Sequence, residues 1–562
     1  MEMPNFNDIL YERPSLEQFR DCALRVRLKI MTAHTEGVVA AALAEFQKEL
    51  SHFETHSALC RIKHDTDTSD PFYLDELSYF EMADAVVSDL SSGVYSALLS
   101  SDIADVLKAE FGSMIFLKAQ NRKDTVSTEI INDLAEEASL QNEYDQILSD
   151  SLIHFRGQDY SYSMMDPFLE STDREYRKEA HEAVSHFYSE NSSRFDNIFD
   201  QLVKLRSSIS TKLSYPSFVE LGYKRMERYD YTPEMVLQFR QNILKYIVPI
   251  TTEIRRLQQN RLGVSELKYY DLPVIFANGN PKPCISVDQF HGAASRMFQT
   301  IFEKDPSFYD VLYQHGFTDL KARKAKSTGG YCATLVDYGI PFIFTNANGM
   351  SDDVTTLIHE AGHAYAAIRS VDSSAFIECI SPTLETCEIH STAMEYLSYP
   401  YLENFFAEDA DACRQLHMTQ SLLFLPYGCM VDEFQHLVYS NPEMSCENRH
   451  QIWRELEEKY QPFLDYDHMN FYEKGGAWQK KGHIYTDPFY YIDYCLAQVV
   501  SLELWDMSRE NPKKALRVYD QLCMEGGNAT FLELLAKAGL ESPFSTDIIK
   551  RVAYRACDFL NL

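Results

Sequence analysis

Apolar residues recur at helical spacing along most of this chain. Long stretches keep a single apolar face and contain few glycines or prolines, which is typical of amphipathic helices that pack on a core. We therefore expect a mainly α-helical protein without internal repeats. The clearest periodic stretches predict helices over Phe19 to Leu50, Ser78 to Leu98, Asp133 to Leu152, Arg174 to Leu213 and Pro233 to Gln259.

One short apolar run departs from the helical pattern. Tyr338 to Thr345 is typical of a β-strand, and Pro341 within it favours a strand at the edge of a sheet. An exposed edge can pair with an extended peptide through backbone hydrogen bonds. Just upstream, Gly329 and Gly330 would let the backbone approach a ligand closely, so Gly330 is a candidate substrate-binding residue.

The most informative motif lies in the helix that this strand leads into. Ser351 and Asp352 are suitable N-cap residues, and apolar positions then recur at helical spacing as far as Ile368. Within this helix stand His359, Glu360 and His363. Residues four apart lie on one helix face, so both imidazoles can reach one zinc ion while Glu360 faces a water bound to it.

A catalytic zinc usually has three protein ligands, and the third is sought in a second helix. Ser381-Pro382 predicts the start of this helix, which continues to Leu397 before Pro400. Its acidic residues are Glu385, Glu388 and Glu395. By themselves, these acids are equally typical of a solvated helix face.

With its second helix, the motif resembles peptidase family M3, the zinc oligopeptidases. His-Glu-Ala-Gly-His at 359–363 is followed by Glu388, which lies 29 residues after His359 (388 − 359). The branch that the chain most resembles contains the bacterial oligoendopeptidases F and the Pz-peptidases; thimet oligopeptidase and neurolysin are more distant. The resemblance implies one zinc ion per chain held by His359, His363 and Glu388. It implies Glu360 as general base, with Glu395 supporting the site.

A second part of the resemblance lies near the C-terminus. Residues 473–478, Glu-Lys-Gly-Gly-Ala-Trp, precede a tyrosine-rich segment that begins at His483. In the family, the corresponding histidine and tyrosines contact the substrate and the tetrahedral intermediate. The resemblance assigns His483 and Tyr494 to catalysis and leaves Tyr485 and Tyr490 as alternative substrate-binding residues.

The resemblance also implies a domain organisation and a fold. It covers residues 165–560 most closely, so we expect an N-terminal helical region at 1–165 and a catalytic region at 166–562, with a boundary near Gly157 to Ser171. Family members enclose their zinc in a deep substrate channel between two largely helical halves. The expected fold is therefore mainly α, with a small β-sheet beside a zincin-type active site.

The resulting functional prediction is a zinc metallo-endopeptidase that hydrolyses short peptides. Two alternatives remain open from the residues alone. One is a zinc aminopeptidase or dipeptidase, which would need an anionic pocket for the free amine of its substrate. The other is a non-catalytic helical protein that binds peptides, although binding alone does not require Glu360.

Composition narrows the possible partners and location. The net charge of −32 disfavours nucleic acid and anionic membranes, since binding phosphate depends on lysine and arginine. No apolar run approaches the ~20 residues of a membrane span, and the N-terminus lacks a signal-peptide pattern. Twelve cysteines without metal-type spacing fit a reducing cytoplasm. The sequence does not predict the oligomeric state.

Overall fold

The computed structural model describes residues 4–302 and 308–562, which are mainly helical. Two compact units divide the chain, and each draws on separate stretches of sequence. The first unit comprises residues 1–123, 282–410 and 500–542; the second comprises 124–281, 411–499 and 543–562. This division does not coincide with the boundary near residue 165, which stays a prediction.

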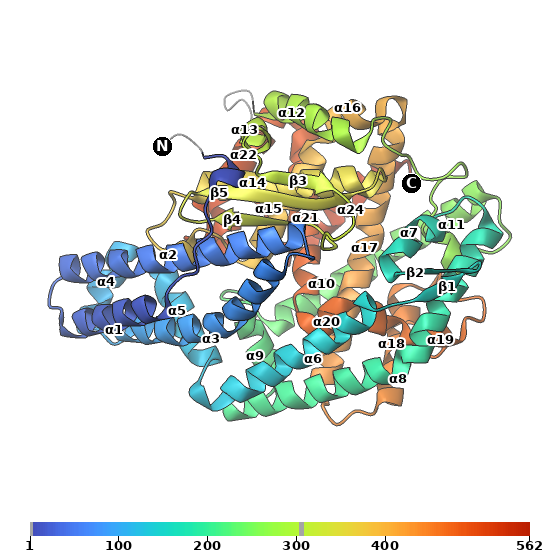
Figure 1. Cartoon of the computed structure of the whole chain (residues 1–562). Coiled ribbons are helices and arrows are strands. Elements are labelled where there is room, and N and C mark those ends of the chain that lie inside the picture. Colours follow the sequence, from blue (N-terminus) through green and yellow to red (C-terminus); the bar gives the residue numbers. More distant parts are fainter. Residues whose placement is uncertain (1–3, 303–307) are drawn as a thin grey trace. The chain divides into compact units, whose positions relative to one another are not determined.

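The first unit contains a three-stranded sheet with helices packed around it (Figure 1). Its elements are α1 (Leu16–Thr32), α2 (Glu36–Thr66), α3 (Pro71–Leu99), α4 (Ala104–Phe111), α5 (Ser113–Thr125), α12 (Phe290–Ile301), α13 (Phe308–Gln314), β3 (Thr318–Lys321), β4 (Tyr331–Leu335), β5 (Ile340–Ala347), α14 (Ser351–Ser370), α15 (Leu384–Leu397), α16 (Glu403–Phe406), α22 (Pro512–Glu525) and α23 (Phe531–Ala538).

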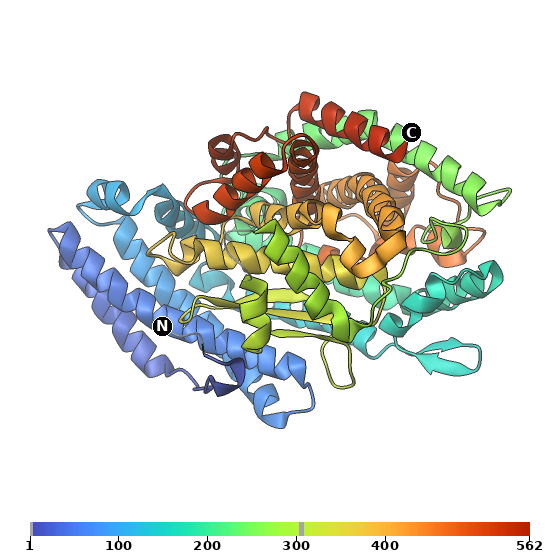
Figure 2. The same cartoon turned by 90° about the horizontal axis from the view of Figure 1, so that it is seen from above.

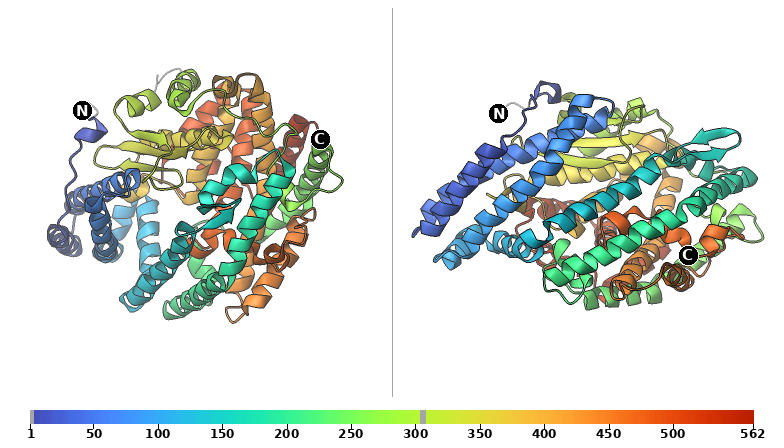
Figure 3. Two further views of the ribbon diagram at one scale, coloured as in Figure 1. Left: turned by 45° about the vertical axis from the view of Figure 1, so that its right-hand side comes forward. Right: turned by 60° about the horizontal axis from the view of Figure 1, so that its bottom comes forward.

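The second unit is built around long helices, with α6 running beside α8 (Figure 3). Its elements are α6 (Ile131–Ser149), β1 (Ile153–Phe155), β2 (Gln158–Tyr160), α7 (Asp166–Leu169), α8 (Arg174–Lys212), α9 (Phe218–Arg225), α10 (Pro233–Tyr246), α11 (Val248–Leu262), α17 (Ala410–Tyr439), α18 (Cys446–Tyr460), α19 (Asn470–Glu473), α20 (Gly482–Thr486) and α24 (Thr546–Leu560). The remaining helix, α21 (Tyr491–Glu510), runs through the boundary at residue 499, and α5 and α17 extend past their boundaries by two residues and by one residue.

The predicted helices are present, but two of them are broken. The stretch from Phe19 to Leu50 forms α1 and the first half of α2, because the chain is extended at Ala33 and restarts at Thr35, the N-cap of α2. The stretch from Pro233 to Gln259 forms α10 and α11. The break there lies next to Pro249, which has no N–H to donate to the preceding turn.

The predicted strand exists, but its place in the sheet differs from the expectation. The strand order is β3-β5-β4, so β5, which contains Pro341, is central and β4 is an edge strand. β4 pairs with β5 antiparallel, whereas β3 pairs with it in parallel. The β3 ladder starts at Ile343, so Pro341 lies beyond it, where a missing N–H interrupts no bond to β3. The prediction of Tyr338 to Thr345 as an edge strand was therefore wrong.

The helix α14 crosses one face of this sheet, and the side of α14 that faces away from the sheet packs against α15 (Figure 2). The start of α14 is fixed by Asp353, whose Oδ2 accepts hydrogen bonds from the backbone N–H groups of residues 348–350, at 2.8, 2.5 and 2.7 Å. The N-cap is Met350, one residue before the predicted Ser351. α15 begins after Thr383, two residues later than Ser381-Pro382 predicts, and ends at Leu397 as expected.

Gly362 allows α14 and α15 to approach closely. A Cβ atom at this position would lie 2.6 Å from the His390 carbonyl oxygen and 2.8 Å from the Ser391 Cα. Both atoms belong to the α15 backbone, which cannot rotate away as a side chain could. The prediction of a mainly helical chain with a small sheet is confirmed. Within the described residues, no helix is both long and apolar enough to traverse a bilayer.

Replacing Gly362 by alanine should force the two helices apart. We expect Gly362→Ala to lower the free energy of unfolding by about 1–3 kcal/mol, the usual range for an overpacked core. The measurement is the midpoint of urea unfolding, followed by far-UV circular dichroism. Gly37→Ala is the matched control because no atom lies within 4 Å of a Cβ at that helical position. Equal midpoints for the two variants would contradict the close contact.

Candidate metal centre

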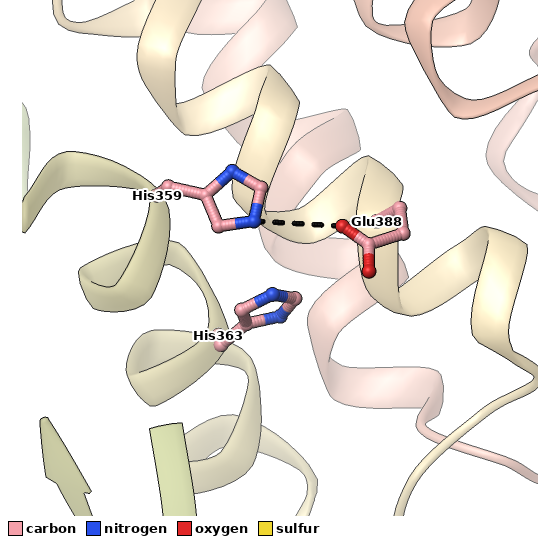
Figure 4. Close-up of side chains that lie close together, drawn as sticks. All are labelled: His359, His363 and Glu388. Carbon is pink, nitrogen blue, oxygen red and sulfur yellow. Dashed lines mark ion pairs between the residues drawn. The ribbon is translucent and has the colours of Figure 1, made fainter. Parts of the chain in front are cut away.

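Three side chains from α14 and α15 converge to form a potential metal site (Figure 4). His359, His363 and Glu388 each offer one ligand atom, and these atoms all lie within 4.8 Å of one another. His359 and His363 are one turn apart, with ring centroids separated by 5.0 Å. Glu388 comes from the neighbouring helix and faces His359, with its Oε2 3.5 Å from the imidazole Nε2.

The orientation of His359 is set by a second carboxylate. Its Nδ1–H donates to Glu395 Oε1 at 2.6 Å, which leaves Nε2 to face Glu388. A carboxylate on the far nitrogen is the usual way in which a metal-binding histidine is held in one tautomer. Glu388 is held in turn by Ser391, whose hydroxyl lies 3.3 Å from its Oε2.

The electrostatics of the site favour a cation. Burial alone would lower the pKa of His359, but its hydrogen bonds to Glu388 and Glu395 raise that pKa well above its ordinary value. Among the residues that the structure describes, His363 has no such hydrogen-bond partner, and burial together with the charge on His359 lowers its pKa to about 4. The two acids thus stabilise a positive charge on His359. A bound metal ion would supply the positive charge in place of the proton.

The donor set fits a divalent transition metal. Two imidazoles and one carboxylate are the ligands of several catalytic zinc sites. Ligand atoms around a tetrahedral zinc are separated by about 3.3 Å, given bonds of ~2.0–2.1 Å. A span of 4.8 Å therefore requires only small side-chain movements to close around an ion.

Glu360 lies next to this group on α14, in a buried position, and its carboxyl group faces the start of β4. The residue is 6% exposed, and burial raises the pKa of its carboxyl group to about 7. Gly330 is its neighbour on the strand side, where a Cβ would lie 3.6 Å from Glu360 Oε1. A carboxyl group with a pKa near neutrality is suited to taking up and releasing a proton.

The predicted C-terminal residues form a separate cluster in the second unit. The His483 ring lies 5.8 Å from that of Tyr490, 5.0 Å from Tyr491 and 5.9 Å from Tyr494, measured between centroids. Tyr485 lies elsewhere: it is fully buried, stacks on Tyr144 at 4.0 Å and has its hydroxyl 3.5 Å from the Phe195 carbonyl oxygen. Of the two alternative tyrosines, Tyr490 is the one beside His483.

Sequence reasoning missed two features of this site. Ser391 stands three residues after Glu388, a spacing that signals contact on a helix but occurs too often to be singled out. The position of β4 beside Glu360 depends on strand pairing and has no local signal.

Comparisons with known proteins agree with this geometry. The chain matches the profile described as "Peptidase family M3" over residues 168–554 and "Peptidase M3 N-terminal domain" over residues 6–126. The solved structure of Pz peptidase A with an inhibitor is 40% identical, with a TM-score of 0.95 and 99% of both chains covered.

Curated proteins match with lower identity. An oligoendopeptidase F homolog of Lactococcus lactis is 21% identical over 71% of this chain and 65% of its own length. The oligopeptidase PepF of Bacillus subtilis is 23% identical over 66% of this chain and 55% of its own length. The matched region thus spans less than two thirds of these two relatives.

Removing a ligand should remove the metal. We expect the purified protein to retain about one divalent ion per chain, and His359→Ala or His363→Ala to lose it, as measured by inductively coupled plasma mass spectrometry. His186→Ala, an exposed histidine on α8 whose side chain is 74% accessible, is the control. Full metal content in both ligand variants would rule out this group as the binding site.

Glu395 should affect metal affinity without touching the metal. Glu395→Gln removes the charge that polarises His359, and such supporting groups typically contribute 10–100-fold in affinity. Competition with a chromogenic chelator measures the change, with the exposed Glu408→Gln as control. If Glu395→Gln bound the ion as tightly as wild type, the hydrogen bond would have no role in tuning the ligand.

Proposed function

Because this chain belongs to peptidase family M3, we propose that it is a zinc oligoendopeptidase, which hydrolyses internal bonds of short peptides. The observation that carries the proposal is the grouping of His359, His363 and Glu388 with the buried carboxyl group of Glu360 beside it. A similar structure bears the name of a peptidase, and the curated relatives are described as oligopeptidases.

We assign zinc as the ion on the chemistry of its ligands. His359, His363 and Glu388 would hold it, and Glu395 would keep Nδ1 of His359 protonated so that Nε2 is available. When bound, zinc would lower the pKa of a water ligand toward ~7 and polarise a substrate carbonyl.

Glu360 is proposed as the general base. Its carboxylate would take the proton from the attacking water and pass it to the departing amine nitrogen. The burial that raises its pKa keeps bulk water away from this proton. Gly330 supports the role sterically, since a side chain there would occupy the space next to Glu360 Oε1.

His483 and Tyr494 are proposed as donors to the oxyanion that develops on the substrate carbonyl, with Tyr490 as a substrate contact. Support comes from the family resemblance and from the clustering of these three rings, since Tyr490 and Tyr494 are 4.9 Å apart. The buried position of Tyr485 favours a packing role for that residue instead.

The substrates are proposed to be short, unfolded peptides that pair with the free edge of β4. This strand bonds to β5 on one side only within the described sheet. Pairing of this kind recognises backbone rather than side chains and fits a broad choice of peptides.

A cytoplasmic location is likewise proposed from the composition, and the net charge of −32 makes nucleic acid an unfavourable partner.

Glu360→Gln should separate metal binding from catalysis. We expect full metal content but a loss of about 10⁴-fold or more in kcat, since both proton-transfer steps lose their carboxylate. Hydrolysis of an internal bond in an unlabelled nonapeptide is followed by chromatography and mass spectrometry. Glu143→Gln, an exposed change on α6, is the control. Wild-type turnover in Glu360→Gln would exclude the general-base role.

His483→Ala should reduce kcat by about 10²–10³-fold with little change in KM, the usual effect of losing one oxyanion donor. His186→Ala again serves as the control. A change in KM alone would indicate a contact with the bound peptide instead of the transition state.

The peptide used also tests the alternatives. An N-acetylated nonapeptide should still be cleaved internally, whereas an aminopeptidase would leave it intact. Casein should be cleaved far more slowly per bond than the nonapeptide, because a folded or large chain cannot enter a confined site. Equal rates would contradict the restriction to short peptides, and no cleavage of any peptide would favour a binding protein.

A further inference from the structure

His483 stands on α20, a helix of only five residues. A helix this short is not stable by itself, so its orientation depends on contacts with other elements. The guanidinium group of Arg206 donates to the Tyr485 carbonyl oxygen. The Gln141 amide donates to the Thr486 carbonyl oxygen at 2.7 Å. Both contacts lie after His483 in the chain, so they hold the end of α20 rather than its first turn.

Lys481 connects the first turn of α20 with α17 and α21. Its carbonyl oxygen accepts a hydrogen bond from the N–H of Ile484 at 3.1 Å. Its ammonium group donates to the Tyr491 hydroxyl at 3.0 Å. The ammonium nitrogen also lies 4.5 Å from the centroid of the Tyr491 ring and 5.4 Å from that of Tyr427. The side chain of Lys481 therefore anchors the chain two residues before His483.

Tyr491 connects this ammonium group with His483. Its ring lies edge-on to the imidazole, with the centroids 5.0 Å apart and the two planes at 66°. The same ring is surrounded by three others, at centroid distances of 5.6 Å from Phe424, 5.9 Å from Tyr427 and 5.7 Å from Tyr494. Tyr491 is only 7% exposed, so its ring has little room to turn and its position limits that of the imidazole.

The ammonium group of Lys481 has no acidic partner. Among the described residues, no carboxylate forms an ion pair with it, although acidic residues outnumber basic ones in the chain. Burial and repulsion from Lys480 lower the pKa of Lys481 to about 8. Other buried cations of the same unit are paired with acids: Arg206 with Glu137, Arg228 with Asp493 and Arg240 with Asp432. A charge that is confined without such a partner is more typical of a functional site than of a packing contact.

We propose that Lys481 is a positioning residue for His483, because its hydrogen bond to the hydroxyl of Tyr491 holds that ring against the imidazole. The ring contact fixes the direction in which the imidazole can donate to the oxyanion of the substrate. Such a donor is effective only within a narrow range of distances and angles. The inference rests on the proposed function of His483 and adds a residue that acts on the reaction through it.

Lys481→Met and Tyr491→Phe each remove the hydrogen bond and keep most of the side-chain volume. We expect each change to lower kcat by about 10–100-fold with little change in KM, since a misplaced donor weakens stabilisation of the transition state but not binding of the peptide. Metal content and the midpoint of urea unfolding, measured on the same preparations, distinguish a slow enzyme from an unfolded one. Lys513→Met, at an exposed lysine on α22, is the control and should keep the wild-type kcat.

A double-mutant cycle tests whether Lys481 acts through His483. In a His483→Ala background, Lys481→Met should cause little further loss of kcat, because the imidazole that it orients is gone. A purely structural role predicts a different result. It would lower the midpoint of unfolding in both backgrounds and leave the two losses of kcat additive.

The outcomes separate failure of the positioning role from failure of the proposed function. Wild-type kcat in either Lys481→Met or Tyr491→Phe, or additive losses in the cycle, overturns the positioning role alone. Full activity of His483→Ala overturns the role of that histidine and the positioning role with it. Wild-type protein that loads metal but cleaves no peptide overturns the proposed function itself.

Discussion

The close contact between α14 and α15 is the constraint on which the metal centre depends. Without a side chain at Gly362, the backbone of α14 lies against that of α15 near His390 and Ser391. This distance brings Glu388 within reach of an imidazole that belongs to the other helix. A wider separation would leave the two histidines as a pair without their acidic partner, and two ligands do not make a closed site.

Polar contacts then orient the ligands before any ion binds. Glu395 fixes which nitrogen of His359 is free, and Ser391 contacts the carboxylate of Glu388. The two acids stabilise positive charge at His359. Because these side chains are already held in place, fewer rotamers are lost when the metal binds, and the conformational-entropy cost of binding is smaller.

The parts of this structure that local pattern determines were predictable from the sequence. Helical periodicity identified α8 almost to the residue, and the four-residue spacing placed His359 and His363 on one face. It could not distinguish Glu388 from Glu385, since both lie on the same short helix; that choice came from the family resemblance. Strand order was not predictable, because the pairing of β3 with β5 joins segments more than twenty residues apart.

The contact between α22 and α15 has a consequence for how the protein is made. The Tyr519 hydroxyl donates to the His390 carbonyl oxygen at 2.8 Å, at the same turn of α15 that receives Gly362. On a ribosome, residues 359–395 emerge long before Tyr519 is synthesised, so the helices that carry the ligands form first and gain this support last. The turn of α15 that lies against Gly362 therefore gains this contact only after residue 519 has been synthesised.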